Sequence, residues 1–237
     1  MRPSVDIVIP VHNEVGFLPG ALGRLLDEIS GIDADIAVIL AENGSTDGTG
    51  ELAERLAAKE VRVRVLRLPK PDYGAAMRAG FTNAGAAWVV NFDIDYYSAD
   101  FLRSALALAG EADIVLASKR APGADDQRGL VRRMGTFGFN RLLRAMFGSK
   151  VSDTHGMKMI RRDLVTRIAP TVISNQDLFD TELVIRAERA GARIAEVPAI
   201  VEELREARSS FLGRVPRTIK GLWRIRRALR SEARSGR

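Results

Sequence analysis

The sequence predicts an α/β fold in which helices flank a mostly parallel β-sheet. Short β-rich runs alternate with segments that carry apolar residues at three- and four-residue spacing, as expected of strands joined by crossover helices. With 237 residues, of which 46% are hydrophobic, the chain can form one sizeable core but is short for two. Polar residues follow each predicted strand, where open α/β sheets bind their ligands.

The alternation is clearest in the first half of the chain. Strands are predicted over residues 6–11, 35–41, 61–68, 87–92 and 113–117. The helices between them are predicted over residues 15–29, 46–58, 73–84 and 99–108. Side-chain oxygens of residues 45–47 can cap the second helix, and Ser98 can cap the fourth. This rhythm predicts parallel pairing of the strands.

The second half is less regular. Residues 121–127 are predicted to form a loop and 132–147 an amphipathic helix, which together fit a lid or an element on the side where a second ligand binds. Further strands are predicted over 157–160 and 193–197, and helices over 179–190 and 211–234. We therefore expect one domain over residues 1–213 and a basic amphipathic helix or tail over residues 214–237.

Positive charge is concentrated at the C-terminal end. The formal net charge is +6, but nine basic residues and Glu232 give residues 214–237 a charge of +8 and leave the rest at −2. Apolar residues at helical spacing among these cations predict a helix that lies on an anionic membrane surface. A helix packed on the domain with a solvated basic face is the alternative. Nucleic acid is not an expected partner, because no RNA-binding fingerprint or aromatic interleaving accompanies the charge.

Several classes of protein are excluded by what the sequence lacks. It has no cysteine, and therefore no disulfide, thiolate zinc site or thiol nucleophile. It shows no cleavable leader and no apolar run of membrane-spanning length. We expect a cytoplasmic protein, peripheral on the cytoplasmic face of a membrane. Neither a Gly-x-Gly-x-x-Gly after the first strand nor a P-loop motif is present, which argues against dinucleotide oxidoreductases and P-loop enzymes.

An aspartate pair follows the fourth predicted strand. Asp93 and Asp95 flank a single apolar residue, so that one carboxylate can bind a hard cation while the other holds a ligand water or a sugar hydroxyl. Mg²⁺ or Mn²⁺ suits such oxygen ligands. A cap for the following helix is the structural alternative. A phosphotransferase with an Asp-x-Asp nucleophile is disfavoured, because Tyr96 and Tyr97 replace the Thr/Val continuation which that chemistry needs.

The other strand ends offer contacts for a nucleotide. Glu42 and Asn43 precede a glycine-containing turn and can meet a base or ribose, while Asp47 organises that turn. A purely structural turn and helix cap is the alternative. The remaining candidates for contact with a nucleotide are found after the first and third strands: an apolar slot for a flat base at Pro10 and Val11, a ribose contact at Glu14, and a polar contact at Asp72.

Together these segments resemble family 2 glycosyltransferases of the GT-A (Rossmann-like) fold, and among them the polyprenyl- and dolichyl-phosphate hexose synthases. The likeness extends over roughly residues 4–213, and the joint order of its motifs carries it: 9–14, 43–49, 93–95, 117–120, 152–158, 179–183 and 196–198. In this family the acidic triplet is usually followed two residues later by a glutamine. Tyr97 stands there in this sequence, and a phenol is a poorer hard-cation ligand than an amide oxygen.

The resemblance implies roles for individual residues. Pro10, Glu14 and Glu42 would contact the nucleoside, and Asp93 and Asp95 would hold the sugar and the cation. The implied phosphate clamps are arginines of the second half: Arg120, Arg132, Arg205 and Arg208. Arginine's planar fork suits phosphate oxygens.

The implied reaction is an inverting, metal-dependent transfer of a hexose from a nucleotide-diphosphate sugar to a polyprenyl phosphate. Mannose from GDP-mannose is favoured, with glucose from UDP-glucose as the second candidate. Asp95, Asp153 and Arg205 are the expected catalytic residues, Asp153 as a general base if the acceptor is a hydroxyl. Transfer to a soluble hydroxyl acceptor, or a non-catalytic nucleotide-sugar-binding protein at a membrane surface, are the alternatives.

Overall fold

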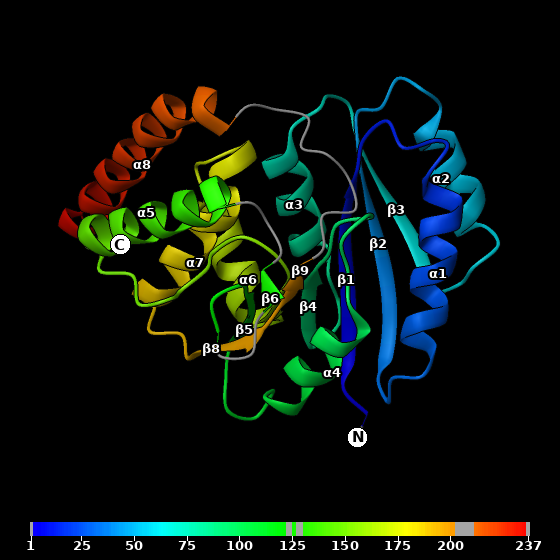
Figure 1. Ribbon diagram of the computed structural model, residues 1–237. Coiled ribbons are helices and arrows are strands. Elements are labelled where there is room, and N and C mark those ends of the chain that lie inside the picture. Colours follow the sequence, from blue (N-terminus) through cyan, green and yellow to red (C-terminus); the bar gives the residue numbers. More distant parts are fainter. Residues whose placement is uncertain (1, 122–124, 127–129, 202–210, 236–237) are drawn as a thin grey trace.

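A seven-stranded sheet forms the centre of the computed structural model, which describes residues 2–121, 125–126, 130–201 and 211–235 (Figure 1). The strand order is β3–β2–β1–β4–β7–β5–β8. The strands are β1 (Ser4–Val11), β2 (Asp35–Asn43), β3 (Val63–Leu68), β4 (Trp88–Asn91), β5 (Ile114–Ser118), β7 (Lys158–Arg161) and β8 (Ile194–Pro198). All neighbouring pairs are parallel except the two that β7 makes with β4 and β5. The predicted mostly parallel sheet is confirmed.

Helices cover both faces of this sheet, and the alternation of strand side chains decides which face each residue serves. In β1, Val5, Ile7 and Ile9 join a core with α1 (Leu18–Ser30), α2 (Thr49–Ala57) and α4 (Ala99–Ala107). Val8 points the other way, into a core with α3 (Tyr73–Thr82), α6 (Arg162–Ile168) and α7 (Phe179–Arg189). All four of these β1 side chains are fully buried.

The predicted elements of the first half are present, and two of the helices begin later than predicted. The helix expected from residue 15 begins at Leu18, because residues 14–17 form a turn closed by the Phe17 N–H on the Glu14 carbonyl and Pro19 stands in the first helical turn. The helix expected from residue 46 begins at Thr49, after Gly48 at φ 91°. Ser98 caps α4 as predicted, accepting from the Phe101 N–H at 3.1 Å.

The sequence pattern did not predict three short helices of the second half. These are α6 and two 3₁₀ turns, Ala169–Thr171 and Gln176–Leu178. A separate parallel pair, β6 (Asp125–Asp126) with β9 (Ile200–Val201), was not predicted either. The two-residue strands are too short to show an alternation, and helices of three to seven residues span no more than about two turns, too few to show a helical hydrophobic period.

The two long helices of the second half, α5 (Leu130–Phe147) and α8 (Phe211–Arg234), pack beside α7 (Figure 1). A third apolar cluster joins them, formed by Leu143, Leu178, Ile185, Leu222, Ile225 and Leu229. The boundary expected at residues 213 and 214 therefore falls inside a helix that packs on the rest of the chain. Within the described ranges, none of the helices has the length and apolar character needed to cross a membrane.

Candidate functional site

The polar ends of β1 and β2 meet at one edge of the sheet because these strands run parallel and in register, with Val11 beside Glu42. His12 Nδ1 donates to the Asn43 carbonyl oxygen at 2.8 Å, which joins the residues that follow the two strands. The Asn43 side-chain oxygen in turn accepts from the Asp72 N–H at 2.7 Å. Three segments predicted to hold the donor are thus brought together.

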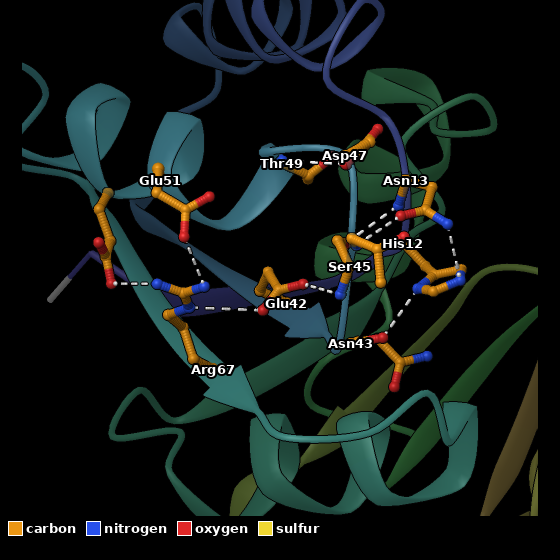
Figure 2. A network of polar contacts seen from close by, with 11 residues as sticks. His12, Asn13, Glu42, Asn43, Ser45, Asp47, Thr49, Glu51 and Arg67 are labelled. Carbon is orange, nitrogen blue, oxygen red and sulfur yellow. Dashed lines mark hydrogen bonds and ion pairs between the residues drawn. The ribbon is translucent and has the colours of Figure 1, made fainter.

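The loop between β2 and α2 is held by its own side chains and by the turn after β1 (Figure 2). Asp47 accepts from the N–H and hydroxyl of Thr49 and from the Val15 N–H. The Asn13 side-chain oxygen accepts from the Thr46 N–H at 2.9 Å, and Ser45 Oγ accepts from the Asn13 N–H at 3.0 Å. The predicted role of Asp47 in organising this loop is confirmed, and the loop is fixed on both sides before any ligand arrives.

Glu42 is almost completely buried at the start of this loop. One carboxylate oxygen accepts from the Ser45 N–H at 2.6 Å, and the other lies 3.6 Å from Arg67 Nε (Figure 2). Arg67 also pairs with Glu51, at 3.0 Å. Glu42 therefore supports the loop backbone as well as standing at the predicted nucleoside position.

Pro10 and Val11 differ in accessibility. Val11 is 1% exposed and belongs to the core beneath α1, whereas Pro10 is half-buried on the opposite face of β1. Of the two residues predicted to line a slot for the base, only Pro10 offers its side chain to a ligand. Glu14, also half-buried, closes the turn before α1 through its carbonyl and donates its N–H to Thr49 Oγ1 at 2.8 Å.

Asp72 caps α3. One of its carboxylate oxygens accepts from the Ala75 N–H at 2.9 Å, and the other accepts from the Asn175 side-chain amide at 2.7 Å. The Asp72 carboxylate thus accepts two hydrogen bonds from protein groups, and a ligand that contacts it would also contact Asn175.

Asp93 and Asp95 stand in a tight turn directly after β4. The Asp93 and Tyr96 backbones exchange two hydrogen bonds of 3.1 Å, which fixes the triplet at the end of the strand. Loss of hydration, followed by the negative charges of Asp180 and Asp95, raises the pKa of Asp93 to about 6. The Asp93 side chain still has exposed surface, so it is open to a ligand although protein groups reduce its hydration.

This acidic group is suited to a cation. The carboxylates of Asp180 and Asp95 both repel the charged form of Asp93, and an added positive charge would relieve this repulsion. In the described part of the chain no three His, Cys, Asp or Glu side chains are arranged to hold a metal by themselves. A cation at Asp93 and Asp95 would therefore take further oxygens from water or from a ligand. Tyr97 packs on Phe92 and its hydroxyl interacts with Arg24 of α1.

A buried lysine lies beside this group. Lys158 is 1% exposed and donates to Asn91 Oδ1 at 3.0 Å, to the Gly156 carbonyl at 2.8 Å and to Asp180 Oδ1 at 2.8 Å. The second Asp180 oxygen accepts from the Tyr73 hydroxyl at 2.9 Å. Burial, and then the negative charge of Asp180, hold the pKa of Tyr73 well above its usual value, so Tyr73 remains a donor.

Lys119 and Arg120 follow β5 and have different surroundings. Lys119 is largely buried, with its Nζ 3.4 Å from Asp153 Oδ2, and its charge lowers the pKa of Asp93. Arg120 is exposed and lies over the Phe137 ring of α5 at 5.1 Å. The nearer cation to the acidic group is therefore Lys119, whereas Arg120, the predicted clamp, contacts α5.

Asp153 is 3% exposed. Its Oδ1 accepts from the His155 N–H at 3.0 Å, and its Oδ2 has no hydrogen-bond partner apart from the ion pair with Lys119. Ser152, beside it, is fixed by Glu196, which accepts from the Ser152 N–H and hydroxyl at 2.7 and 2.9 Å. Asp153 is thus a buried carboxylate held in a rigid segment beside a lysine.

Three of the predicted clamps cannot be placed. The Arg132 side chain, Arg205 and Arg208 lie outside the described residues. Residues that sequence reasoning did not assign to the site are Lys119, Lys158, Asp180 and Tyr73. A signal for Lys119 was available, because it is the first residue after β5 and so stands at the same edge of the sheet as the other predicted site residues.

Known proteins resemble this chain in sequence and in fold. The model of the family described as Glycosyl transferase family 2 matches residues 6–168. The chain belongs to this family. It is 32% identical over 213 residues to an undecaprenyl-phosphate mannosyltransferase of Micrococcus luteus, with 86% of each chain covered. It is 30% identical over 207 residues to a polyprenol monophosphomannose synthase of Mycolicibacterium smegmatis, covering 83% of this chain and 77% of the relative. The chain is therefore a glycosyltransferase.

Solved structures share the fold. A glucosyl-3-phosphoglycerate synthase of Mycobacterium tuberculosis, in complex with Mn²⁺, UDP and phosphoglyceric acid, matches with a TM-score of 0.69 at 22% identity, covering 94% of this chain and 78% of that one. A mannosyltransferase of Pyrobaculum calidifontis in complex with GDP-Man and Mn²⁺ matches with a TM-score of 0.65 at 21% identity, covering 92% and 61%. These similarities confirm the predicted GT-A fold.

Proposed function

We propose that the enzyme transfers a hexose, with inversion, from a nucleotide-diphosphate sugar to a polyprenyl phosphate. The observation that carries the proposal is the meeting of an acidic group, Asp93 and Asp95, with a largely buried cation, Lys119, at the edge of the sheet where β1 and β2 also end. The acidic group suits a metal-bound diphosphate, and the lysine suits an anionic acceptor. The names of the curated relatives support the lipid phosphate and favour mannose over glucose.

The donor would lie along the ends of β1, β2 and β4. Pro10 supplies an apolar surface for the base, and Glu14, Asn43 and Asp72 are the nearby polar groups for the nucleoside. Glu42 is buried, so it would act on the nucleoside by holding the loop after β2. Asp93 and Asp95 would hold Mg²⁺ or Mn²⁺ together with the donor diphosphate. When bound, the cation would neutralise charge on the departing nucleoside diphosphate. The complexes of two structural neighbours with Mn²⁺ support this assignment.

The acceptor would enter from the side of α5 and β5. A phosphate oxygen is already anionic and needs positioning rather than deprotonation before it attacks the anomeric carbon. Lys119 is placed to position it, and Arg120, Arg132, Arg205 and Arg208 are proposed to bind phosphate oxygens as the transfer proceeds. Asp153 orients Lys119 through their 3.4 Å ion pair.

A soluble hydroxyl acceptor is the second candidate, and one observation favours it. The buried Asp153 Oδ2 lacks a hydrogen-bond donor, so it can accept the proton of an attacking hydroxyl. A structural neighbour in complex with phosphoglyceric acid illustrates an acceptor that is not a lipid. The two classes of acceptor give different products, so one experiment that identifies the product distinguishes a lipid phosphate acceptor from a soluble hydroxyl acceptor.

The decisive assay incubates the enzyme with GDP-mannose or UDP-glucose and either a polyprenyl phosphate or 3-phosphoglycerate, with Mn²⁺, Mg²⁺ or EDTA. Mass spectrometry of the products is expected to show a hexosyl polyprenyl phosphate, formed with GDP-mannose and a metal. NMR of the anomeric centre reports inversion. Product from 3-phosphoglycerate alone would replace the first proposal by the second.

We also propose that α8 holds the enzyme peripherally on the cytoplasmic face of an anionic membrane. Arg217, Lys220, Arg224, Arg227 and Trp223 line one broad concave surface of α8 and the segment before α7. Cationic side chains with an exposed tryptophan suit a headgroup region. Sedimentation with phosphatidylglycerol vesicles tests this assignment, with Arg224→Ala/Arg227→Ala expected to weaken binding and vesicles of phosphatidylcholine as the control. Equal binding of both proteins to both vesicles would refute it.

A further inference from the structure

A cavity of about 550 Å³ lies between α5 and α8. Sites for small ligands typically have volumes of roughly 300–1,000 Å³. Much of its wall is apolar and comes from both helices and from the segment before α7, through Phe139, Leu142, Leu178, Val215 and Ile219. The proposed transfer involves Lys119 and Asp153 at the polar end of this cavity, but none of the residues of its apolar wall.

The polar residues of the cavity form one group. Lys119, Asp153 and His155 line it, and they contact one another: Lys119 Nζ lies 3.4 Å from Asp153 Oδ2, and Asp153 Oδ1 accepts from the His155 N–H at 3.0 Å. Lys119 also acts electrostatically on Asp93. The cavity therefore connects an apolar wall to a cation that neighbours the acidic group of the donor site.

Exposed apolar side chains gather on the same two helices. Of the eight large apolar side chains that are exposed in the described part of the chain, five belong to α5 and α8: Met134, Phe137, Val215, Ile219 and Trp223. Val215 and Ile219 line the cavity themselves, so its apolar wall continues to the outer surface of α8. Such exposed apolar surface typically marks an interaction site.

We propose that this cavity binds the first apolar units of an isoprenoid phosphate, with its phosphate at Lys119 and the rest of its chain leaving along α8. The inference rests on the proposed lipid-phosphate acceptor and names the part of the protein that recognises its chain. Charge and polarity both support this occupant, since a single anion at the end of an apolar chain matches one lysine at the end of an apolar wall. A small, fully polar acceptor would gain nothing from that wall.

Two variants fill the cavity from opposite helices. Gly138 of α5 lines it, and a Cβ at this position meets no atom within 4 Å, so Gly138→Phe can be accommodated. Thr218→Phe adds an aromatic ring from α8. Gly23→Phe is the matched control, because Gly23 is also an exposed helical glycine with nothing within 4 Å, on α1, outside the cavity.

The test is calorimetric titration of each variant with farnesyl phosphate, and separately with inorganic phosphate and GDP. Both cavity variants are expected to bind farnesyl phosphate about tenfold more weakly than the Gly23→Phe control, with the affinity for GDP unchanged. Inorganic phosphate binding is expected to be equal in all three. If neither cavity variant weakens farnesyl phosphate binding relative to the control, or if all three weaken it equally, the inference is overturned.

Hexose transfer assays distinguish this failure from failure of the proposed function. Transfer to polyprenyl phosphate with an unchanged KM for that acceptor in both cavity variants would retain the function and reject the cavity. Weakened farnesyl phosphate binding without any transfer to a lipid phosphate would retain the cavity and reject the acceptor proposal.

Discussion

The Lys158 ammonium lies 2.8 Å from the Asp180 carboxylate and 3.0 Å from the Asn91 side-chain oxygen, so one buried cation joins β7, α7 and β4 beside Asp93. Removal of Lys158 would leave Asp180, whose side chain is 13% exposed, without its cation. Breaking one partner of a buried pair typically destabilises a protein by about 3–5 kcal/mol. We expect a loss of that size in Lys158→Met, measured by urea unfolding.

The double variant Lys158→Met/Asp180→Asn is the control, because it removes both charges. Its unfolding free energy is expected to exceed that of Lys158→Met. Equal stability of the wild type and Lys158→Met would contradict the assigned role of this pair.

Asp93 makes the stability of the metal-free protein dependent on pH. Its pKa in the folded state, about 6, lies above the ordinary aspartate value of roughly 3.9. The folded state therefore binds the Asp93 proton more tightly than the unfolded state does. Protonation of Asp93 stabilises the fold fully below about pH 4, and this stabilisation is lost as the pH rises through about 6. Asp93→Asn should gain stability relative to the wild type between pH 4 and pH 7.5 in urea titrations. A difference that does not change with pH would reject the raised pKa.

Gly44 shapes the loop after β2. It has φ +61°, and a Cβ there would lie 2.6 Å from the Lys70 carbonyl carbon. Gly44→Ala combines a strained backbone with a clash against main chain, so we expect a loss of more than about 1 kcal/mol and weaker nucleotide binding. Gly48→Ala is the matched control, because Gly48 has φ +91° with open space around it. Thermal unfolding that ranks the two variants equally would contradict the close approach.

Glu232 anchors the C-terminal half of α8. Both of its carboxylate oxygens accept from Arg186, at 2.9 and 3.0 Å, and Arg186 Nε donates to the fully buried Glu182 at 2.7 Å. Glu232→Ala is expected to speed amide hydrogen exchange in α8 about tenfold while α4 exchanges as in the wild type. Arg186→Met should have the larger effect on overall stability, because it also removes the cation from Glu182. Unchanged exchange in α8 would show that apolar packing alone holds this helix.

The sheet and one edge of the site could be predicted from the sequence because parallel strands place their carboxyl ends together. That rule alone predicts that Asp93 and the loop at Asn43 lie at the same edge of the sheet. The rule does not predict that β7 is inserted antiparallel between β4 and β5, because the alternation of strands and helices along the first half of the chain ends before this strand. Lys158 belongs to β7, so the position of this buried lysine in the site could not be predicted either.

Other site residues depend on tertiary contacts. Val11 has the residue type expected of an apolar slot, but the register of β1 turns it into the core. Glu42 has the residue type expected of a ribose contact, and its burial beside Arg67 adds a structural role that no sequence spacing shows. Asp180 stands in the first turn of α7, more than eighty residues after Asp93, and only packing of α7 on the sheet brings their charges together.

The central claim, that Asp93 and Asp95 bind a donor diphosphate through a cation for hexose transfer, is tested most directly by nucleotide release from GDP-mannose with farnesyl phosphate and Mn²⁺. The wild type is expected to release nucleotide in a reaction that EDTA abolishes. In Asp95→Ala, kcat/KM is expected to fall about 100-fold or more, because charge on the leaving group would go unstabilised. Turnover that persists in EDTA, or that is equal in Asp95→Ala and the wild type, would contradict this claim.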